Sequence, residues 1–298
     1  MPKPNLIAPF FITGFTLLYS VLLVMNPVAA KAPVWEVRLG DNRIYLAGTI
    51  HLLSSKDYPL PSAFDVAYEQ SQSIVFETDL SVAGAANTQA QLLPTIISTD
   101  GTTLESRLNT ATFDQFKTFL KSRKLALPMF EMLTPAGVNL SLLAIELQKL
   151  GINGENGVET HFNARARKDK KNISWLESIE EQVEALNKMN QVDPNMMVSS
   201  TLDDLEKLPE TWPILVKNWR EGKMKSLGDI ALDSMLESAP ELYDALIIDR
   251  NNNWMPAINQ MLKTPETELI LVGALHLTGE HSILKLLDMP GLQVRQLD

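Results

Sequence analysis

Short apolar runs with strand-like character lie near both ends of the chain. Residues 34–39 and 43–50 alternate apolar and polar positions around the turn Gly40-Asp41-Asn42, a pattern typical of a β-hairpin. Other short apolar runs predict further strands at residues 73–77, 172–177, 269–272 and 293–295. Most of the predicted strands therefore belong to the first and last segments of the chain.

A mainly helical pattern fills residues 103–264 between these strands. Helices are predicted at residues 62–71, from about 112, and at 134–150, 158–170, 178–190 and 282–287, with more over 200–264. Residues 81–101 are polar and weakly patterned, which predicts a loop or a short helix. Capping signals predict four helix starts: Ser62 with Asp65, Thr112 with Gln115, Thr134 before Pro135, and Ser178 with Glu181.

This order of elements favours an α/β (α+β) fold. A central mixed β-sheet would be formed by the N- and C-terminal segments, with a large helical block inserted at about residues 103–264. Residues 31–298 are expected to form a single domain. An ancient duplication could relate the two strands that carry the paired motif described below by a pseudo-twofold axis.

The first 30 residues read as a targeting segment. Lys3 provides a short positive region, residues 6–25 are nearly all apolar, and Pro27-Val28-Ala29-Ala30 offers small residues for cleavage. We therefore expect a secretory signal peptide and a periplasmic or extracellular protein. The alternative is an uncleaved membrane anchor over residues 6–25, since about 20 apolar residues can span a bilayer.

Composition excludes several classes of function. The net charge of −10 argues against nucleic-acid binding, which needs clustered basic residues, and the basic run 165–171 is interpreted as the solvated end of a helix. Cysteine is absent, so the chain has no disulfide, no thiolate nucleophile and no cysteine-based zinc site. Any metal ion would have to be held by histidine and carboxylate side chains.

Two distant segments share one pattern, in which an apolar strand ends in Gly-x-x-His. They carry Gly48-x-x-His51 and Gly273-x-x-His276, and the whole chain has only four histidines. Glycine at a strand end permits a sharp turn or a close approach, which would place the histidine at the rim of the sheet. Two buried, hydrogen-bonded core histidines are the alternative, but the matched pair favours a functional site.

Glu77 ends an apolar strand in the same way, and it supplies a carboxylate beside the two imidazoles. His51, His276 and Glu77 together suit a divalent metal ion and leave a position open for water. A metal-bound water can be ionised near neutral pH and attack a carbonyl group. Glu77 could be the third ligand or the general base. Arg250 could stabilise an oxyanion, or it could be a surface residue at a helix junction.

The remaining candidates have weaker signals. Glu159 and His161 have a spacing that sends them to different faces of a helix, so they are poor co-ligands, and His161 is expected at the surface. Glu177 ends a strand and is expected to support the site, whereas His281 lies in a polar turn and is expected to be exposed. No zincin helix, nucleophile elbow or phosphate-binding glycine loop is present.

The chain resembles the TraB/PrgY/GumN family, which includes the Tiki proteases. The resemblance covers residues 34–297 and lies in the paired Gly-x-x-His motifs, Glu77, Leu176-Glu177-x-x-Glu180-x-Gln182 and Arg250-Asn251-x-x-Trp254. It implies a metal-dependent hydrolase, and Tiki-like members cleave peptides with Mn²⁺ or Co²⁺. By this resemblance His51, His276 and Glu77 take the metal and catalytic positions, and Arg250 is the cation beside them.

The sequence therefore predicts an exported metal-dependent hydrolase that cleaves a peptide or protein substrate with Mn²⁺, Co²⁺ or Zn²⁺. A non-catalytic protein that sequesters a peptide is the first alternative, and a metal or haem scavenger is a weaker one. All metal-based alternatives require the two histidine rings to lie well within 10 Å of each other.

Overall fold

The computed structural model describes residues 31–81, 86–232, 235–236 and 239–298. The predicted signal peptide at residues 1–30 lies outside these ranges. Among the described residues, none of the helices combines the length and the apolar character that crossing a membrane requires.

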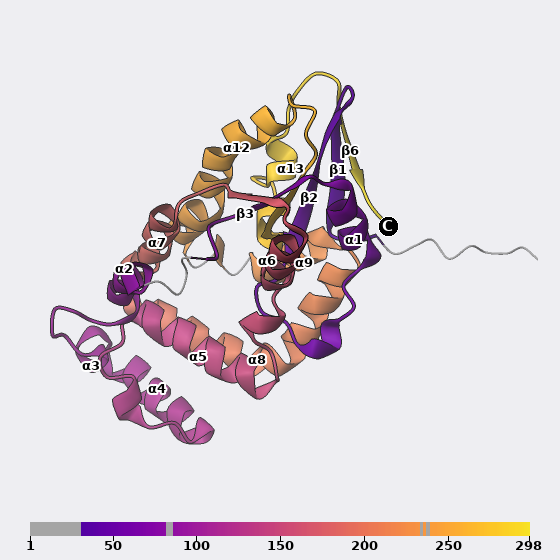
Figure 1. Ribbon diagram of the computed structural model, residues 1–298. Coiled ribbons are helices and arrows are strands. Elements are labelled where there is room, and N and C mark those ends of the chain that lie inside the picture. Colours follow the sequence, from indigo (N-terminus) through magenta and orange to yellow (C-terminus); the bar gives the residue numbers. More distant parts are fainter. Residues whose placement is uncertain (1–30, 82–85, 233–234, 237–238) are drawn as a thin grey trace, which may run out of the picture.

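A six-stranded mixed sheet forms the centre of the fold, in the order β4-β3-β5-β2-β1-β6 (Figure 1). Its strands are β1 (Val34–Leu39), β2 (Asn42–Thr49), β3 (Ser73–Phe76), β4 (Asn172–Trp175), β5 (Glu268–Gly273) and β6 (Leu292–Gln296). Five of these strands come from the two ends of the chain, as predicted. β4 lies inside the expected helical block and extends the sheet beside β3.

The register of the parallel strands brings the two Gly-x-x-His motifs side by side. β2 and β5 are parallel neighbours that pair Gly48 with Val272 and Thr49 with Gly273, so both motifs leave the sheet at one edge. β3 lies parallel to β5 on its other side, which brings the end of β3 to the same edge. Loops at the carboxyl ends of parallel strands are where α/β proteins commonly place their sites.

The described helices agree broadly with the predicted pattern. They are α1 (Ser62–Gln70), α2 (Ala86–Ile96), α3 (Leu104–Arg107), α4 (Thr110–Arg123), α5 (Pro135–Lys149), α6 (Val158–Asp169), α7 (Ile179–Asn187), α8 (Pro194–Arg220), α9 (Met224–Ala231), α11 (Pro240–Tyr243), α12 (Asp249–Met261) and α13 (Ile283–Leu286). A π-helical turn, Asp244–Ile248, joins α11 to α12. The short-helix option for residues 81–101 is the one observed, as α2.

Two of the four predicted capping pairs are wrong. The N-cap of α1 is Pro61 and has no side-chain hydrogen bond, so Ser62 lies inside the helix. α4 begins one turn earlier than Thr112 predicted, because the Asn109 side chain accepts from the Thr112 backbone N–H. Asparagine is a stronger N-cap residue than threonine, and it takes the position.

The other two capping predictions are confirmed. Thr134 caps α5 by accepting from the Gly137 backbone N–H, with a proline at the first helical position. Ser178 and Glu181 form a reciprocal capping box at the start of α7. Both signals depend only on residues within the first turn, which explains why they can be read from sequence.

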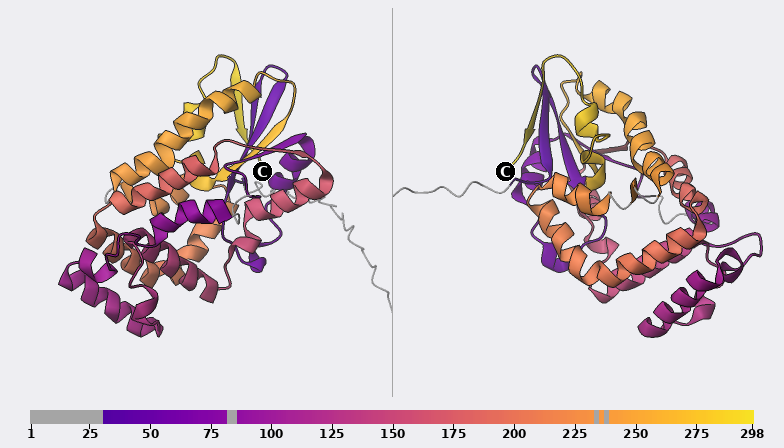
Figure 2. Two further views of the ribbon diagram at one scale, coloured as in Figure 1. Left: turned by 60° about the vertical axis from the view of Figure 1, so that its left-hand side comes forward. Right: turned by 180° about the vertical axis from the view of Figure 1, so that it is seen from behind.

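The sheet lies between two groups of helices. α12 and α13 cover one face and α1 and α6 cover the other, with the end of α8 beside them (Figure 2). A second apolar cluster joins α4, α5 and α8, and α3 and α4 lie farthest from the sheet (Figure 2). The edge that carries both motifs is therefore close to the main core and rests on buried side chains.

Glu268, the first residue of β5, is buried at 7% exposure, and its Oε2 atom has no hydrogen-bond partner. Burial, with the nearby Glu266, raises the pKa of Glu268 to about 7. A raised carboxyl pKa lowers stability as pH rises from the unfolded value of about 4.5 through 7. We expect Glu268→Gln to raise the free energy of unfolding at pH 8 by about 1–3 kcal/mol, measured by urea denaturation.

The gain should shrink as pH falls through 7 and should vanish below pH 4.5, where the glutamate becomes protonated in both states. Glu280→Gln is a matched control, because Glu280 is exposed. This control should leave the unfolding midpoint unchanged at both pH values. Equal midpoints for Glu268→Gln and the wild type at pH 8 would contradict the assignment of a buried, unpaired carboxylate.

Candidate functional site

Three of the predicted site residues meet beside Gly273, at the carboxyl end of β5. A methyl group placed on Gly273 would lie 3.2 Å from Glu77 Oε1, 3.6 Å from His51 Nε2 and 3.6 Å from His276 Cδ2. The two histidine rings therefore lie well within 10 Å of each other. Glycine at this position leaves the space into which the three side chains project.

Glu77 follows β3 directly, and both of its carboxylate oxygens are hydrogen-bonded. Oε1 accepts from the Gly273 backbone N–H at 2.6 Å, and Oε2 accepts from Arg250 Nη2 at 2.6 Å. Burial opposes ionisation of this carboxyl group, but the Arg250 guanidinium and the hydrogen bond from the Gly273 N–H hold the pKa of Glu77 below its usual range. Glu77 is therefore a carboxylate at neutral pH.

Arg250 lies inside the site, so the surface alternative considered from sequence is wrong. Its side chain is 13% exposed, and it bridges Glu77 and Glu177 through Nη2 at 2.6 and 2.7 Å. Nη1 lies 3.2 Å from His276 Nε2 and 3.4 Å from the Leu246 carbonyl oxygen. The guanidinium is thus the cation that links the carboxylates to one of the histidines.

Glu177 and Trp254 hold this guanidinium in place. The Arg250 guanidinium carbon lies 4.7 Å from the Trp254 ring centroid, four residues further along α12. Trp254 Nε1 donates to Glu177 Oε2 at 3.0 Å, and Arg250 Nε donates to the same oxygen at 3.1 Å. Burial raises the pKa of Glu177, against the opposing effect of Arg250. Glu177 therefore supports the site by positioning Arg250, in agreement with the supporting role expected from the sequence.

His276 is buried, and its hydrogen bonds define its tautomer. Asn251 Nδ2 donates to the carbonyl oxygens of His276 and His281, so Asn251 Oδ1 must accept from His276 Nδ1 at 2.7 Å. Nε2 then carries the lone pair, which faces Arg250 and Glu77. Burial lowers the pKa of His276 to about 3, so the ring is neutral in the folded protein.

His51 follows β2 and has a partner that the sequence did not indicate. Its Nδ1 lies 2.8 Å from Glu159 Oε1, and 63% of the His51 side chain is exposed, whereas the Glu159 side chain is buried. The same Glu159 oxygen accepts from the Thr49 hydroxyl. The Glu159 carboxylate raises the pKa of His51 to about 9. The Glu159 contact leaves Nε2 of His51 facing the space beside Gly273.

Glu159 is the site residue that sequence reasoning missed. As predicted, Glu159 and His161 diverge on α6, and His161 packs against Tyr58 and Phe162. His161 is half-buried, so its predicted surface position is only partly right. The contact of Glu159 with His51 depends on α6 starting against β2, where Gly157 leaves no room for a side chain beside the His51 carbonyl. No local pattern reveals such a contact.

The donor atoms suit a divalent cation in type and in charge. Glu77, Glu159 and Glu177 are buried carboxylates at one site, and they outnumber the two cations beside them, Arg250 and the protonated His51. Both histidines use Nδ1 for an oxygen partner, an arrangement that orients Nε2 atoms towards metals in many proteins. In the described part of the chain, however, no three His, Asp or Glu side chains are already positioned to hold an ion.

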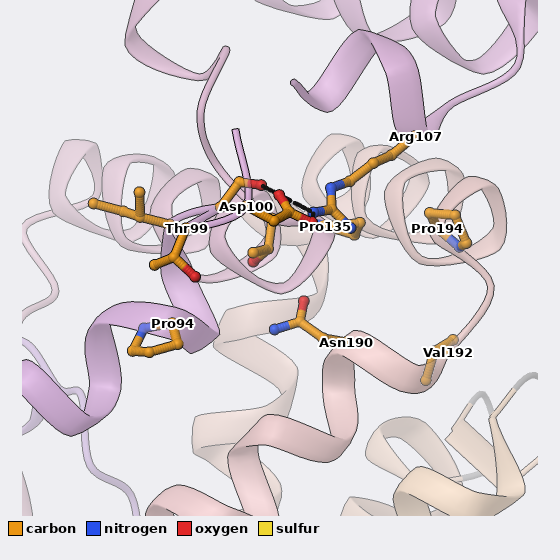
Figure 3. A pocket seen from close by; sticks show the side chains of 11 residues that line it. Pro94, Thr99, Asp100, Arg107, Pro135, Asn190, Val192 and Pro194 are labelled. Carbon is orange, nitrogen blue, oxygen red and sulfur yellow. Dashed lines mark hydrogen bonds and ion pairs between the residues drawn. The ribbon is translucent and has the colours of Figure 1, made fainter. Parts of the chain in front are cut away.

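One cavity adjoins this site, and another lies away from it. One of about 300 Å³ is bordered by Glu177 and Arg250, between α7 and α12. Figure 3 shows another, of about 420 Å³, where Arg107 reaches Asp100 beside Asn190. None of the predicted site residues lines the cavity of Figure 3. His281 is exposed, as predicted.

Comparison with known proteins points to one family. The sequence profile described as the TraB/PrgY/gumN family matches residues 33–296. Uncharacterized protein YbaP of Escherichia coli (strain K12) is 24% identical over 277 residues, which cover 91% of this chain and 99% of that protein. A metalloprotease TIKI homolog of Nematostella vectensis is 24% identical over 305 residues, covering 84% of this chain and 64% of that protein. No solved structure matches the chain.

Proposed function

This chain belongs to the TraB/PrgY/gumN family, and on that premise we propose that it is an exported metal-dependent hydrolase acting on peptide bonds. The observation that carries the proposal is the meeting of Glu77 with the Nε2 atom of His51 and the ring of His276 beside Gly273. The name of the Nematostella relative, a metalloprotease homolog, supports hydrolytic chemistry. The apolar segment at residues 6–25 supports export.

The metal-binding residues in this proposal are His51, His276 and Glu77. A bound Mn²⁺, Co²⁺ or Zn²⁺ would polarise a carbonyl group and supply an activated water. Two imidazole nitrogens and one carboxylate are a common ligand set for such ions, with a position left for substrate or solvent. The excess of buried negative charge favours a cation at this place over a neutral occupant.

The surrounding side chains would orient the three ligands. Glu159 fixes the ring of His51, and Asn251 fixes the tautomer of His276 so that its Nε2 atom can donate a lone pair. Glu177 and Trp254 position Arg250, whose planar guanidinium can hold a substrate carbonyl or carboxylate oxygen. Glu77 is placed either to bind the ion or to accept a proton from the attacking water.

Removal of divalent metal tests this proposal directly. We expect the purified protein to cleave a mixture of unstructured peptides, and we expect a chelator to abolish the cleavage. Mn²⁺, Co²⁺ or Zn²⁺ added in excess over the chelator should restore it. New peptide termini, detected by mass spectrometry, report the activity without knowledge of the physiological substrate. Cleavage that persists unchanged after exhaustive chelation would contradict the metal-dependent mechanism.

A second function is supported by one specific contact. Arg250 already places a cation between Glu77 and His276, so the site is partly neutralised without a metal. A protein that binds the carboxylate of a peptide without cleaving the peptide could use the Arg250 guanidinium alone. This alternative predicts peptide binding that survives chelation and leaves the peptides intact.

A further inference from the structure

A separate cavity of about 570 Å³ lies between the second half of α8, the end of α5 and the segment that follows β2. None of Glu77, Arg250 and His276 lines it. Its apolar walls are provided by Leu150, Ile152, Pro209, Trp212, Pro213 and Val216, and the rest of its lining is polar or charged: Ser54, Lys56, Asp57, Lys217, Arg220 and Glu221. Its size and apolar lining fall within the range of small-molecule sites in proteins.

One stripe of α8 forms the longest wall. Pro209, Pro213 and Val216 recur at helical spacing, so they lie on one face of the helix. The two prolines have no backbone N–H and therefore present ring carbons without a donor. Leu150, at the end of α5, is 43% exposed although it lines the cavity. Apolar surface that stays exposed inside a concave site would be covered by an apolar ligand group.

The ammonium groups of two lysines at the rim form no hydrogen bond or ion pair with the described residues. Lys56 and Lys217 both line the cavity and are exposed, and neither ammonium group has a hydrogen bond or an ion pair within the described ranges. Their position is notable in a chain with a net charge of −10. Positive charge beside an apolar wall favours an occupant with an anionic group.

The other charged groups at the rim are already engaged. Arg220 donates to the carbonyl oxygens of Asp57 and Pro59, and the Asp57 side chain accepts from the Ser54 backbone N–H. Glu221 pairs with Lys223 at 2.5 Å, and this contact, together with the charge of Lys217, lowers the pKa of the Glu221 carboxyl group. The two lysines are thus the groups left to bind a ligand.

We propose that this cavity binds a single-chain amphipathic anion, of the chemistry of a medium-chain fatty carboxylate. The hydrocarbon tail would lie against the stripe of α8, and the carboxylate would lie between Lys56 and Lys217. This site shares no residue with the proposed metal site, so the proposal does not depend on the proposed hydrolysis.

Titration calorimetry with dodecanoate, below its micellar concentration, tests the apolar wall. We expect one molecule to bind per chain, and we expect Leu150→Asp to abolish the binding heat because a carboxylate then faces the tail. Ile214→Asp is the matched control: Ile214 is 51% exposed on the same helix but does not line the cavity. Equal affinity of dodecanoate for both variants, or no binding to the wild type, would overturn the proposal.

A second pair of variants tests the anionic group. Lys56→Glu combined with Lys217→Glu should weaken dodecanoate binding at least about tenfold, whereas Lys263→Glu, at an exposed position outside the cavity, should not. Neutral dodecyl maltoside should bind poorly to the wild type. Equal binding of the neutral detergent would overturn recognition of the anion. Binding to phosphatidylglycerol vesicles without binding to free dodecanoate would also overturn the proposal, because it would assign the lysines to a membrane surface.

Discussion

His276→Ala is expected to remove the bound metal and to lower kcat/KM for peptide cleavage by about 10³-fold or more. The variant lacks one of three donors, and Lewis-acid stabilisation worth about 4 kcal/mol corresponds to that factor. The substitution also leaves Asn251 Oδ1 without its hydrogen-bond donor, His276 Nδ1. Metal content by mass spectrometry and peptide cleavage are to be measured on the same preparation.

His281→Ala is the matched control for this experiment. His281 is exposed, lies five residues after His276, and contributes to the site only through its carbonyl oxygen, which alanine retains. The control should keep both the metal and the activity. If His276→Ala contained as much metal as His281→Ala, the metal would be bound at another place in the protein.

Glu77→Gln completes the same experiment by separating two roles. If Glu77 is a ligand, the amide variant should lose metal together with activity. If Glu77 is the general base, the variant should retain the metal and lose activity, since an amide cannot accept the proton. An active Glu77→Gln variant that keeps its metal would contradict both roles.

The sequence predicted the sheet and the edge at which the site residues meet. Two apolar strands that end in the same motif could be expected in one sheet, and the parallel pairing of β2 with β5 puts Gly48 and Gly273 at one edge. Glu77 follows from the same reasoning, because β3 also ends there. These predictions used strand length and residue type, which are local properties of the chain.

The contacts made by helices could not be predicted in the same way. Glu159 is 108 residues from His51, and their contact depends on how closely α6 packs against the end of β2. Asn251 reaches His276 only because α12 covers this face of the sheet. Spacing within a helix reports which side chains share a face, but it does not report what that face contacts. Asn251 and Trp254 stand in a motif of the family resemblance, but no role was predicted for them from the sequence, and among the supporting residues only Glu177 was expected to support the site.

Arg250→Met is expected to lower the free energy of unfolding by about 3–5 kcal/mol in the metal-free protein, measured by urea denaturation at pH 7. The guanidinium is 13% exposed and pairs with Glu77 and Glu177, whose side chains are only 7% and 5% exposed. Removing it leaves two buried carboxylates without a counter-charge, and desolvation of such groups is costly. The loss should decrease as pH falls, because protonation removes both charges.

Arg38→Met is the matched control, and a double variant identifies the cause. Arg38 also pairs with a buried carboxylate, Glu36, at 2.9 Å, but it is 43% exposed and Arg295 contacts the same group, so the loss of stability should be much smaller than for Arg250→Met. Adding Glu177→Gln to Arg250→Met should restore roughly half of the lost stability, since one of two unpaired charges is removed. A divalent ion should also restore stability to Arg250→Met if it binds beside Gly273. Equal, small losses for the two arginine variants would mean that the buried carboxylates at this site do not depend on the guanidinium for their charge balance.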